Sequence, residues 1–318
     1  NIVKGSGYFD YHETYFDPAK ALEEYRENLG KANPNQIITE EDGVKKVFHY
    51  EPSDGIKENL TRINTLIEEG KFDEAEVLVN KSIELDPEYS SLHVYLGRIH
   101  HRKGEVEKAL SSYEQALSVN PVDILALNYK AEALMEKDGL IKDRDSLVRA
   151  LVLQRNYELT WQNLKKLGKE MGFEVYDEPF LPLYSLQRMD NKKIRIYIDL
   201  DTVTRWMPYS FCKAVWQYYP GYFEKKMGEK EYRETLQEEY ECVENMLWSY
   251  NAFRVRGKYP RDPMLERMKD IKTRFFIKEF IKFEIMAPEH PELLTLMDQK
   301  HILDMEDYIK EYILVEKE

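Results

Sequence analysis

The sequence predicts a mostly α-helical protein, an α-solenoid of about three stacked helical hairpins followed by a C-terminal helical domain. The main observation is an internal repeat, because Pro87 and Pro121 lie 34 residues apart and follow similar runs of residues. Charged residues make up 33% of the chain and hydrophobic residues 42%, which is typical of a folded protein with solvated helical surfaces. Ile194, Ile196 and Ile198 alternate with polar or amphipathic residues, so we also expect a small β element.

The two repeat units carry small and turn-forming residues at matching positions. The matched pairs are Gly70 with Gly104, Phe72 with Val106, Ala75 with Ala109, and Pro87 with Pro121. A glycine is the least strained residue in a tight turn between helices, and a proline ends the second helix because it cannot continue one. This pattern resembles the tetratricopeptide repeat family, whose unit is a helix–turn–helix of 34 residues.

The same register extends beyond the second unit. Leu127, Ala131, Leu134 and Ala150 fall on the positions expected for a third hairpin. A further helix over about residues 157 to 171, ending at Gly172, is expected to cap the array, since a solenoid needs a terminal element with a polar outer face. The predicted organisation is an N-terminal lead-in with one helix over 1–55, the repeat array with its capping helix over 56–172, and an aromatic-rich helical domain over 173–318.

The resemblance implies that the first helix of each hairpin lines a concave face that binds a peptide or a segment of a partner. The register gives these candidate peptide-binding residues: Lys57, Asn64, Ser91, Arg98, His101, Asn128, Glu132, Gln162 and Lys166. Arg98, His101 and Lys166 are suited to a ligand that carries a carboxylate. We therefore expect a protein–protein interaction or scaffold protein whose partner is another protein or a peptide.

Two features of the groove remain open. The best-known ligand of this family is the C-terminal carboxylate of heat-shock chaperones, which is held by a set of Lys, Asn and Arg. Leu60, Tyr95 and Tyr129 stand where three of those residues are needed, so we do not expect that ligand here. The alternative to a free groove is a structural subunit whose groove is filled by its own N- or C-terminal segment.

A second resemblance concerns the segment IYIDLDTVT, which is similar to the first motif of haloacid-dehalogenase-like phosphatases. It implies Asp199 as the nucleophile and Asp201 as the acid and base. That chemistry also needs groups that hold the phosphoryl oxygens and magnesium, delivered from the ends of further parallel strands. Because the residues that follow predict helices, we expect one of these carboxylates to cap the next helix. No catalytic residue is assigned, and a hydrolase with its site near Asp199 and Asp201 is the alternative.

Charge and composition exclude other function classes. The net charge is −13, which disfavours nucleic-acid binding because that binding depends on Lys and Arg. No apolar run approaches the roughly 20 residues that a membrane span needs. Metal, phosphate-loop and dinucleotide motifs are absent, so we expect no metal and no cofactor.

The two cysteines and the first residue carry little information on location. Cys212 and Cys242 have no CxxC partner and lie in apolar helical stretches, so we expect each to be a small buried hydrophobe. The chain opens with Asn1 rather than Met, which is typical of a processed or trimmed product. We expect a soluble protein, either cytoplasmic or extracytoplasmic after removal of a signal peptide.

Overall fold

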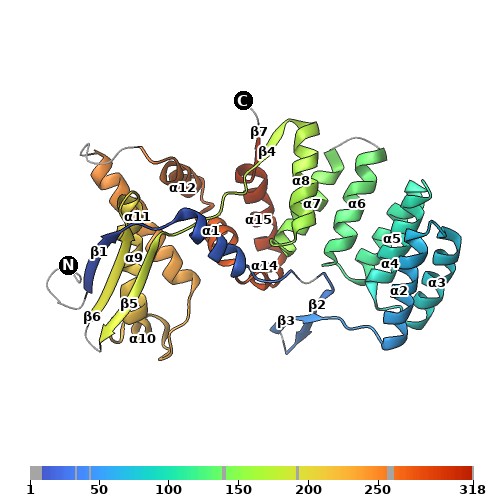
Figure 1. Ribbon diagram of the computed structural model, residues 1–318, viewed down its shortest axis with the longest axis horizontal. Helices are drawn as coiled ribbons and strands as arrows, with labels where there is room; N and C mark the ends of the chain where they lie inside the picture. The colour runs from blue at the N-terminus through green and yellow to red at the C-terminus, as the bar shows by residue number, and fades with distance from the viewer. Residues whose placement is uncertain are drawn as a thin grey trace. The chain divides into compact units, whose positions relative to one another are not determined.

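The computed structural model describes residues 9–32, 34–42, 44–137, 141–190, 193–255 and 261–316 (Figure 1). The chain divides into two compact units, and each unit joins segments that are distant in the sequence. The repeat unit comprises Gly30–Asp177 and Ala287–Glu318, and the sheet unit comprises Asn1–Leu29 and Glu178–Met286. This division differs from the three consecutive segments expected from the sequence, because both ends of the chain pack against elements far along it.

Over the described residues between 54 and 171, the repeat unit forms three helical hairpins and one further helix, as the sequence predicts. Their bounds are α2 (Asp54–Glu68), α3 (Phe72–Leu85), α4 (Ser90–Arg102), α5 (Val106–Val119), α6 (Ile124–Lys137), α7 (Ile141–Leu153) and α8 (Glu158–Met171). Gly70, Gly104 and Gly172 follow α2, α4 and α8 with φ of 72°, 77° and 85°. Residues with a Cβ are strained in this left-handed region, which explains the glycine at each of these helix ends.

The centre of the array is closely packed. Tyr113 and Ala116 of α5 are fully buried, together with Val94 of α4. A Cβ placed on Gly97 of α4 would lie 2.3 Å from Cε1 of Tyr113. The glycine therefore permits the close approach of α4 and α5.

The last residues of the chain return to the repeat unit. Strand β4 (Phe173–Val175) follows α8 and pairs antiparallel with β7 (Leu314–Glu316). Helix α15 (Gln299–Tyr312), which follows the short α14 (Glu292–Thr295), packs on α7. Two ion pairs join α15 to α7: Arg149 to Glu306 at 2.6 Å and Lys310 to Asp145 at 2.8 Å. The last hairpin helix and α8 are thus covered by the chain itself.

A β-hairpin precedes the repeats in the same unit. It consists of β2 (Gln36–Glu41) and β3 (Val44–His49) in antiparallel register. The side chain of Asn120, after α5, donates a hydrogen bond of 2.9 Å to the carbonyl of Gln36. This contact attaches the hairpin to the loop between the second and third helical hairpins.

The sheet unit is built on a three-stranded sheet in the order β1-β6-β5. Strand β1 (Phe9–Thr14) runs parallel to β6 (Lys193–Asp199), and β5 (Tyr184–Asp190) runs antiparallel to it. Ile194, Ile196 and Ile198 are fully buried, which confirms the strand predicted from their alternation. The remaining elements are α1 (Pro18–Glu27), α9 (Val203–Tyr218), α10 (Tyr222–Met227), α11 (Leu236–Val255), α12 (Pro263–Thr273), α13 (Ile277–Phe280) and the π-helix η1 (Ile281–Met286).

Two expectations for this unit differ from the structure. Cys212 and Cys242 are not free buried hydrophobes but form a disulfide between α9 and α11, with their Cα atoms 5.2 Å apart. The packing of α9 on α11 brings the two together, and no local motif reports that contact. Asp262 followed by Pro263 predicts a helix that begins here and continues to about Met286, yet α12 ends at Thr273, and Phe275, two residues later, adopts a φ of 70°.

Candidate functional site

The first helices of successive hairpins are linked by a row of side chains. The amide of Asn64 on α2 donates a hydrogen bond of 3.1 Å to the hydroxyl of Tyr95 on α4. The guanidinium of Arg98 lies 5.3 Å from the ring centroid of Tyr95 and 5.2 Å from that of Tyr129 on α6. We call Asn64, Tyr95, Arg98 and Tyr129 the first-helix ladder.

The repeat period explains the ladder. Asn64 and Arg98 are 34 residues apart, and so are Tyr95 and Tyr129, so each pair occupies equivalent positions on consecutive hairpins. Helix α4 also packs directly on α6, which brings the two tyrosines to either side of one arginine. A stacked array therefore converts residues that are distant in the sequence into one row.

The ladder holds an arginine that is half-buried yet makes no ion pair among the described residues. A ring under the guanidinium contributes about 0.5–1 kcal/mol at a partly exposed site. Tyr129 is itself held by stacking on Tyr113, with ring centroids 6.2 Å apart. Contact through a ring face does not use the in-plane N–H donors of the guanidinium, so those donors remain for a ligand.

Opposite charges meet beside the ladder. Burial raises the pKa of Tyr113, the nearby Glu132 raises it further, and Arg98 opposes them. These effects place Glu132 and Arg98 around the same phenol. A ring nitrogen of His101 lies 2.9 Å from the carboxylate of Glu136, which again joins α4 to α6. The ladder is thus flanked by the carboxylates of Glu132 and Glu136.

Three of the remaining predicted residues lie on the surface. Lys57 is paired with Glu51 at 3.8 Å and with Asp54 at 3.6 Å. Gln162 donates a hydrogen bond of 3.2 Å to Glu158 in its own helix. Lys166 is exposed on α8, at the position that corresponds to Arg98 two hairpins earlier.

Two predicted residues lie inside the packing. Asn128 is fully buried, and its amide donates to the carbonyl of Ile124 at 2.8 Å and to the hydroxyl of Thr160 at 2.9 Å. Ser91 is 3% exposed, and its hydroxyl donates to Asn35 at 3.3 Å. These side chains hold α6 to α8 and α4 to the segment just before β2, so they are not part of the proposed ligand surface.

The aromatic members of the ladder were not among the predicted binding residues. Tyr95 and Tyr129 entered the sequence analysis only as the wrong residues for a chaperone clamp. Their spacing of 34 residues and their position next to Arg98 in the register are the signals that point to a shared role.

The carboxylate of Asp199, the nucleophile of the alternative hydrolase site, is held by hydrogen bonds to neighbouring segments. The carboxylate of Asp199 accepts hydrogen bonds from the backbone N–H of Phe16 at 3.0 Å and from the N–H and hydroxyl of Thr202 at 3.0 and 2.7 Å. It joins the end of β6 to the start of α9 and to the segment after β1, close to the expected capping role. Asp201 is exposed. In the part of the chain that the structure describes, no group of His, Cys, Asp and Glu is arranged to hold a metal ion.

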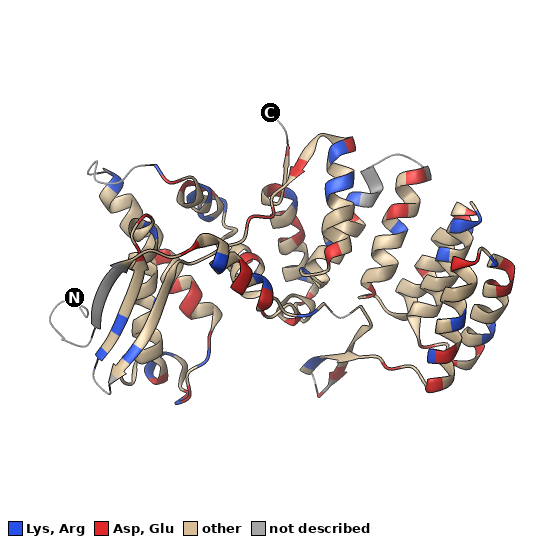
Figure 2. Ribbon diagram, in the orientation of Figure 1, with Lys and Arg blue, Asp and Glu red and all other residues tan. Residues whose placement is uncertain are grey.

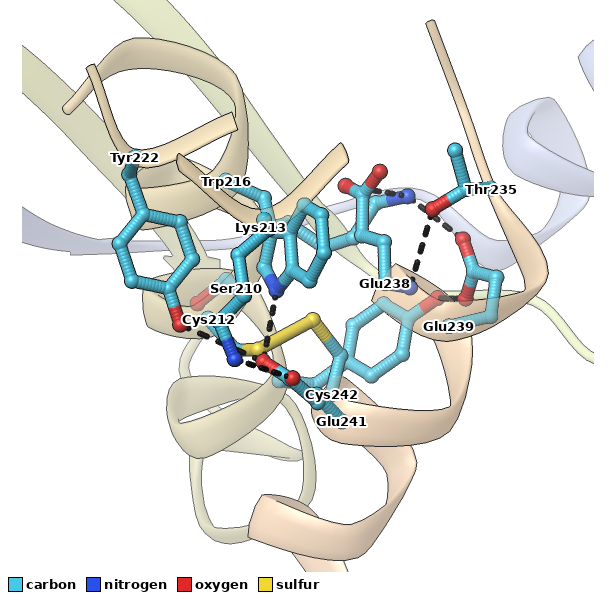
Figure 3. The surroundings of a disulfide bond; sticks show 12 residues. Ser210, Cys212, Lys213, Trp216, Tyr222, Thr235, Glu238, Glu239, Glu241 and Cys242 are labelled. Carbon is cyan, nitrogen blue, oxygen red and sulfur yellow. Dashed lines mark hydrogen bonds and ion pairs between the residues drawn. A yellow bond between two sulfur atoms is a disulfide. The ribbon is translucent and has the colours of Figure 1, made fainter. Parts of the chain in front are cut away.

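A buried charged cluster lies beside the disulfide in the sheet unit (Figure 3). The ammonium of Lys213 on α9 lies 2.5 Å from Glu239 and 3.1 Å from Glu238, both on α11. Burial raises the pKa of Glu238 to about 7, although Lys213 opposes this shift. Two carboxylates share one ammonium in the interior, next to the bond between Cys212 and Cys242. The cluster fixes α9 to α11.

Comparison with known families bears on the repeat unit. The tetratricopeptide repeat family model matches residues 66–133, which run from the end of α2 into α6. The chain contains tetratricopeptide repeats. Protein NPGR2 of Arabidopsis thaliana is 32% identical over 103 residues, which are 31% of this chain and 14% of that protein. The chain therefore spans only a small part of the length of this relative.

Solved structures with similar helical repeats also match a part of the chain. The first tetratricopeptide domain of Spaghetti (RPAP3), bound to an HSP90 peptide, is 22% identical, with 35% of this chain and 88% of that one covered and a TM-score of 0.33. The type III secretion chaperone SycD of Yersinia enterocolitica, in complex with a peptide of the translocator YopD, is 19% identical, with 38% and 92% covered and a TM-score of 0.34. These comparisons do not extend to the sheet unit.

The fold of the repeat unit is that of a protein–protein interaction module, because stacked helical hairpins present extended surfaces to partners. Within the described residues, no helix has the length and apolar character needed to cross a membrane.

Proposed function

We propose that the repeat unit binds a segment of a partner protein across the first-helix ladder. The observation that carries this proposal is Arg98, which is held between the rings of Tyr95 and Tyr129 with its donors unused by any ion pair among the described residues. Placing a cation between two rings restricts its motion before a ligand arrives, which reduces the entropic cost of binding.

The ladder offers two kinds of contact to an extended or helical peptide. Arg98 donates hydrogen bonds to a carboxylate or to backbone carbonyls, and the planar guanidinium favours bidentate contacts. The tyrosine rings bury an apolar side chain of the ligand next to that anchor. Glu132 and the pair of His101 with Glu136 accept hydrogen bonds from backbone N–H groups or from a cation in the same segment. The ligand is therefore expected to be amphipathic, with an acceptor at the position of Arg98.

The position of the C-terminal helix supports a ladder that is open to a partner. Helix α15 packs on α7, the second helix of its hairpin, whereas the ladder belongs to the first helices. This arrangement disfavours the alternative in which α15 fills the groove. The bonds of Asp199 to Phe16 and Thr202 likewise favour a structural role for that carboxylate over a nucleophilic one.

The test is affinity capture from native lysate, followed by calorimetry of the captured partner with purified protein. Arg98→Glu reverses the charge in the ladder, and Arg98→Gln removes it while keeping a long stem. The matched control is Lys108→Glu, because Lys108 is 65% exposed on α5, a second helix. Circular dichroism melting of each variant verifies that the repeats remain folded.

We expect the control to bind like the wild type and Arg98→Gln to bind about tenfold to a hundredfold more weakly, which corresponds to about 1.4–3 kcal/mol. Arg98→Glu is expected to lose binding. Equal affinity of the wild type and both Arg98 variants would place the partner on another surface and contradict the proposal.

A further inference from the structure

The outer side of the α2–α3 hairpin is less covered by other elements of the described chain than the opposite end of the array. At the α8 end, β4 and β7 and the last helix of the chain cover the hairpin packing. The α2–α3 hairpin instead carries an open pocket of about 450 Å³ between its two helices. Val77 on the rim is 71% exposed and Leu85, on the same helix, is 66% exposed. The end of a solenoid normally presents a polar outer face, so this apolar end is suited to a partner.

The residues around the pocket form a stripe along α3. Glu74, Val77, Lys81 and Leu85 follow one another at spacings of three and four residues, and Leu78 is adjacent to Val77, which places all of them on one side of the helix. The opposite side of α3 carries its fully buried residues, among them Ala75 and Val79. The stripe therefore has the pattern of a helix face that packs on a second helix: Leu78 at its edge is partly buried against the α2–α3 core, and the other members of the stripe are exposed.

The charged members of this stripe have no ion pair among the described residues. Glu74 and Lys81 bracket the apolar pair Val77 and Leu78 along the helix. Asp73, one position away from the stripe, is by contrast satisfied by Lys103 of α4 at 2.8 Å. One end of the stripe is thus acidic and the other basic, with an apolar centre.

We infer that a second copy of this chain docks on the α3 stripe, with the two α3 helices antiparallel around a two-fold axis. The axis passes between Val77 and Leu78, so that the Val77 of each copy meets the Leu78 of the other. Glu74 and Lys81 each lie three and a half residues from the axis, which is about 5 Å along a helix that rises 1.5 Å per residue. Each Glu74 then lies opposite the Lys81 of the second copy, and the symmetry makes this pair twice.

Charge complementarity selects a second copy over another helical partner. A two-fold axis places two copies of the same helix antiparallel. The acidic end of each copy therefore meets the basic end of the other, and no other sequence is required. The pocket accepts the exposed Val77 of the facing copy, and this burial supplies the apolar part of the contact.

The inference is tested by the mass of the full chain in solution, measured by light scattering after size exclusion and by sedimentation equilibrium. Protein concentrations extend up to about 100 µM, at which a dimer with a Kd weaker than about 1 mM is a minor species. We expect twice the 38.0 kDa of one chain. Glu74→Lys alone and Lys81→Glu alone each place like charges opposite one another twice, and each is expected to raise the dimer Kd about tenfold or more.

The decisive variant is the double reversal, Glu74→Lys with Lys81→Glu, which restores both pairs and is expected to restore the dimer. Lys108→Glu, at an exposed site on α5, is the control that leaves the dimer unchanged. A monomer at all concentrations would overturn the inference. A dimer that ignores the single reversals, or one that the double reversal does not restore, would overturn it as well, since the copies would then meet elsewhere.

Discussion

The contact between Gly97 and Tyr113 offers a sharp test of the packing on which the first-helix ladder depends. Gly97→Ala adds one methyl group in the middle of α4. That methyl would lie 2.3, 2.6 and 2.8 Å from three ring atoms of Tyr113, which is fully buried and stacked on Tyr129. The ring cannot withdraw without moving α5 or α6, so the substitution should separate α4, which carries Arg98, from α5.

The expected magnitude is the difference between two opposing effects. Adding a methyl group to a filled core costs about 1–3 kcal/mol, and three contacts below 3 Å place this site near the upper end of that range. Replacing glycine by alanine within a helix contributes about 1 kcal/mol in the opposite direction. The net loss of stability of the repeat unit should be about 2 kcal/mol.

The assay is hydrogen exchange of peptides from α4 and α5 across a denaturant series, which reports on the repeat unit separately from the sheet unit. Gly55→Ala is the matched control, because a Cβ on Gly55 meets no atom within 4 Å. It should leave protection unchanged or slightly raised. Combining Gly97→Ala with Tyr113→Leu should cost less than the sum of the two single substitutions. Unchanged or increased stability of Gly97→Ala would refute the proposed packing.

Three further predictions concern the sheet unit. Burial raises the pKa of Glu238 from 4.5 to about 7, so between these pH values the folded state holds a proton that the unfolded state has lost. The free energy of unfolding should therefore fall by up to about 3 kcal/mol as the pH rises through this interval. A denaturation series of Glu238→Gln should show no such fall over the same interval. Reduction of the bond between Cys212 and Cys242, which encloses a separation of 30 residues, should cost about 3–4 kcal/mol in denaturation with and without reductant, and Cys212→Ser should not respond to reductant. Phe275→Gly should stabilise the fold by about 1 kcal/mol in thermal melts, because the exposed Phe275 has a φ of 70°; a loss of stability would show that its ring makes a needed contact.

Much of the repeat unit could be predicted because its signals are local and recur. Gly70 and Gly104 mark turns that need a left-handed residue, and Pro121 marks the end of a second helix, each at the same interval of the chain. The start of α12 was predicted for a similar reason, since Asp262 caps the helix and accepts a hydrogen bond of 3.1 Å from Leu265. The residues of a short segment determine each of these turns and helix ends, so the segment alone is enough to predict them.

Features that depend on distant contacts could not be predicted in this way. The parallel pairing of β1 with β6 joins the start of the chain to a strand near its middle, and no turn or motif reports it. The disulfide depends on how α9 packs against α11, which the spacing of two cysteines does not determine. Lys and Arg are interspersed with Asp and Glu over the helices of both units (Figure 2).

The candidate site likewise includes residues whose role the sequence indicates and residues whose role depends on distant contacts. Asn64 and Arg98 were proposed from the register, and the structure places them in one row with two tyrosines. Asn128 has an equally suitable position in the sequence, but its contact with Thr160 of α8 buries it completely. Whether a residue faces a ligand or a neighbouring helix depends on tertiary packing. The role of Asn64 and Arg98 in ligand binding remains a prediction.

The most direct test of the central claim is the position of the bound partner on the repeats. A photoreactive amino acid is placed at Lys166 or at Lys108, the first on a helix that continues the ladder and the second on the exposed side of α5. The captured partner is then cross-linked and the joined peptides are identified by mass spectrometry. A cross-link from position 166 but not from position 108, lost on Arg98→Glu, is the predicted result. A cross-link from position 108 alone would contradict the account.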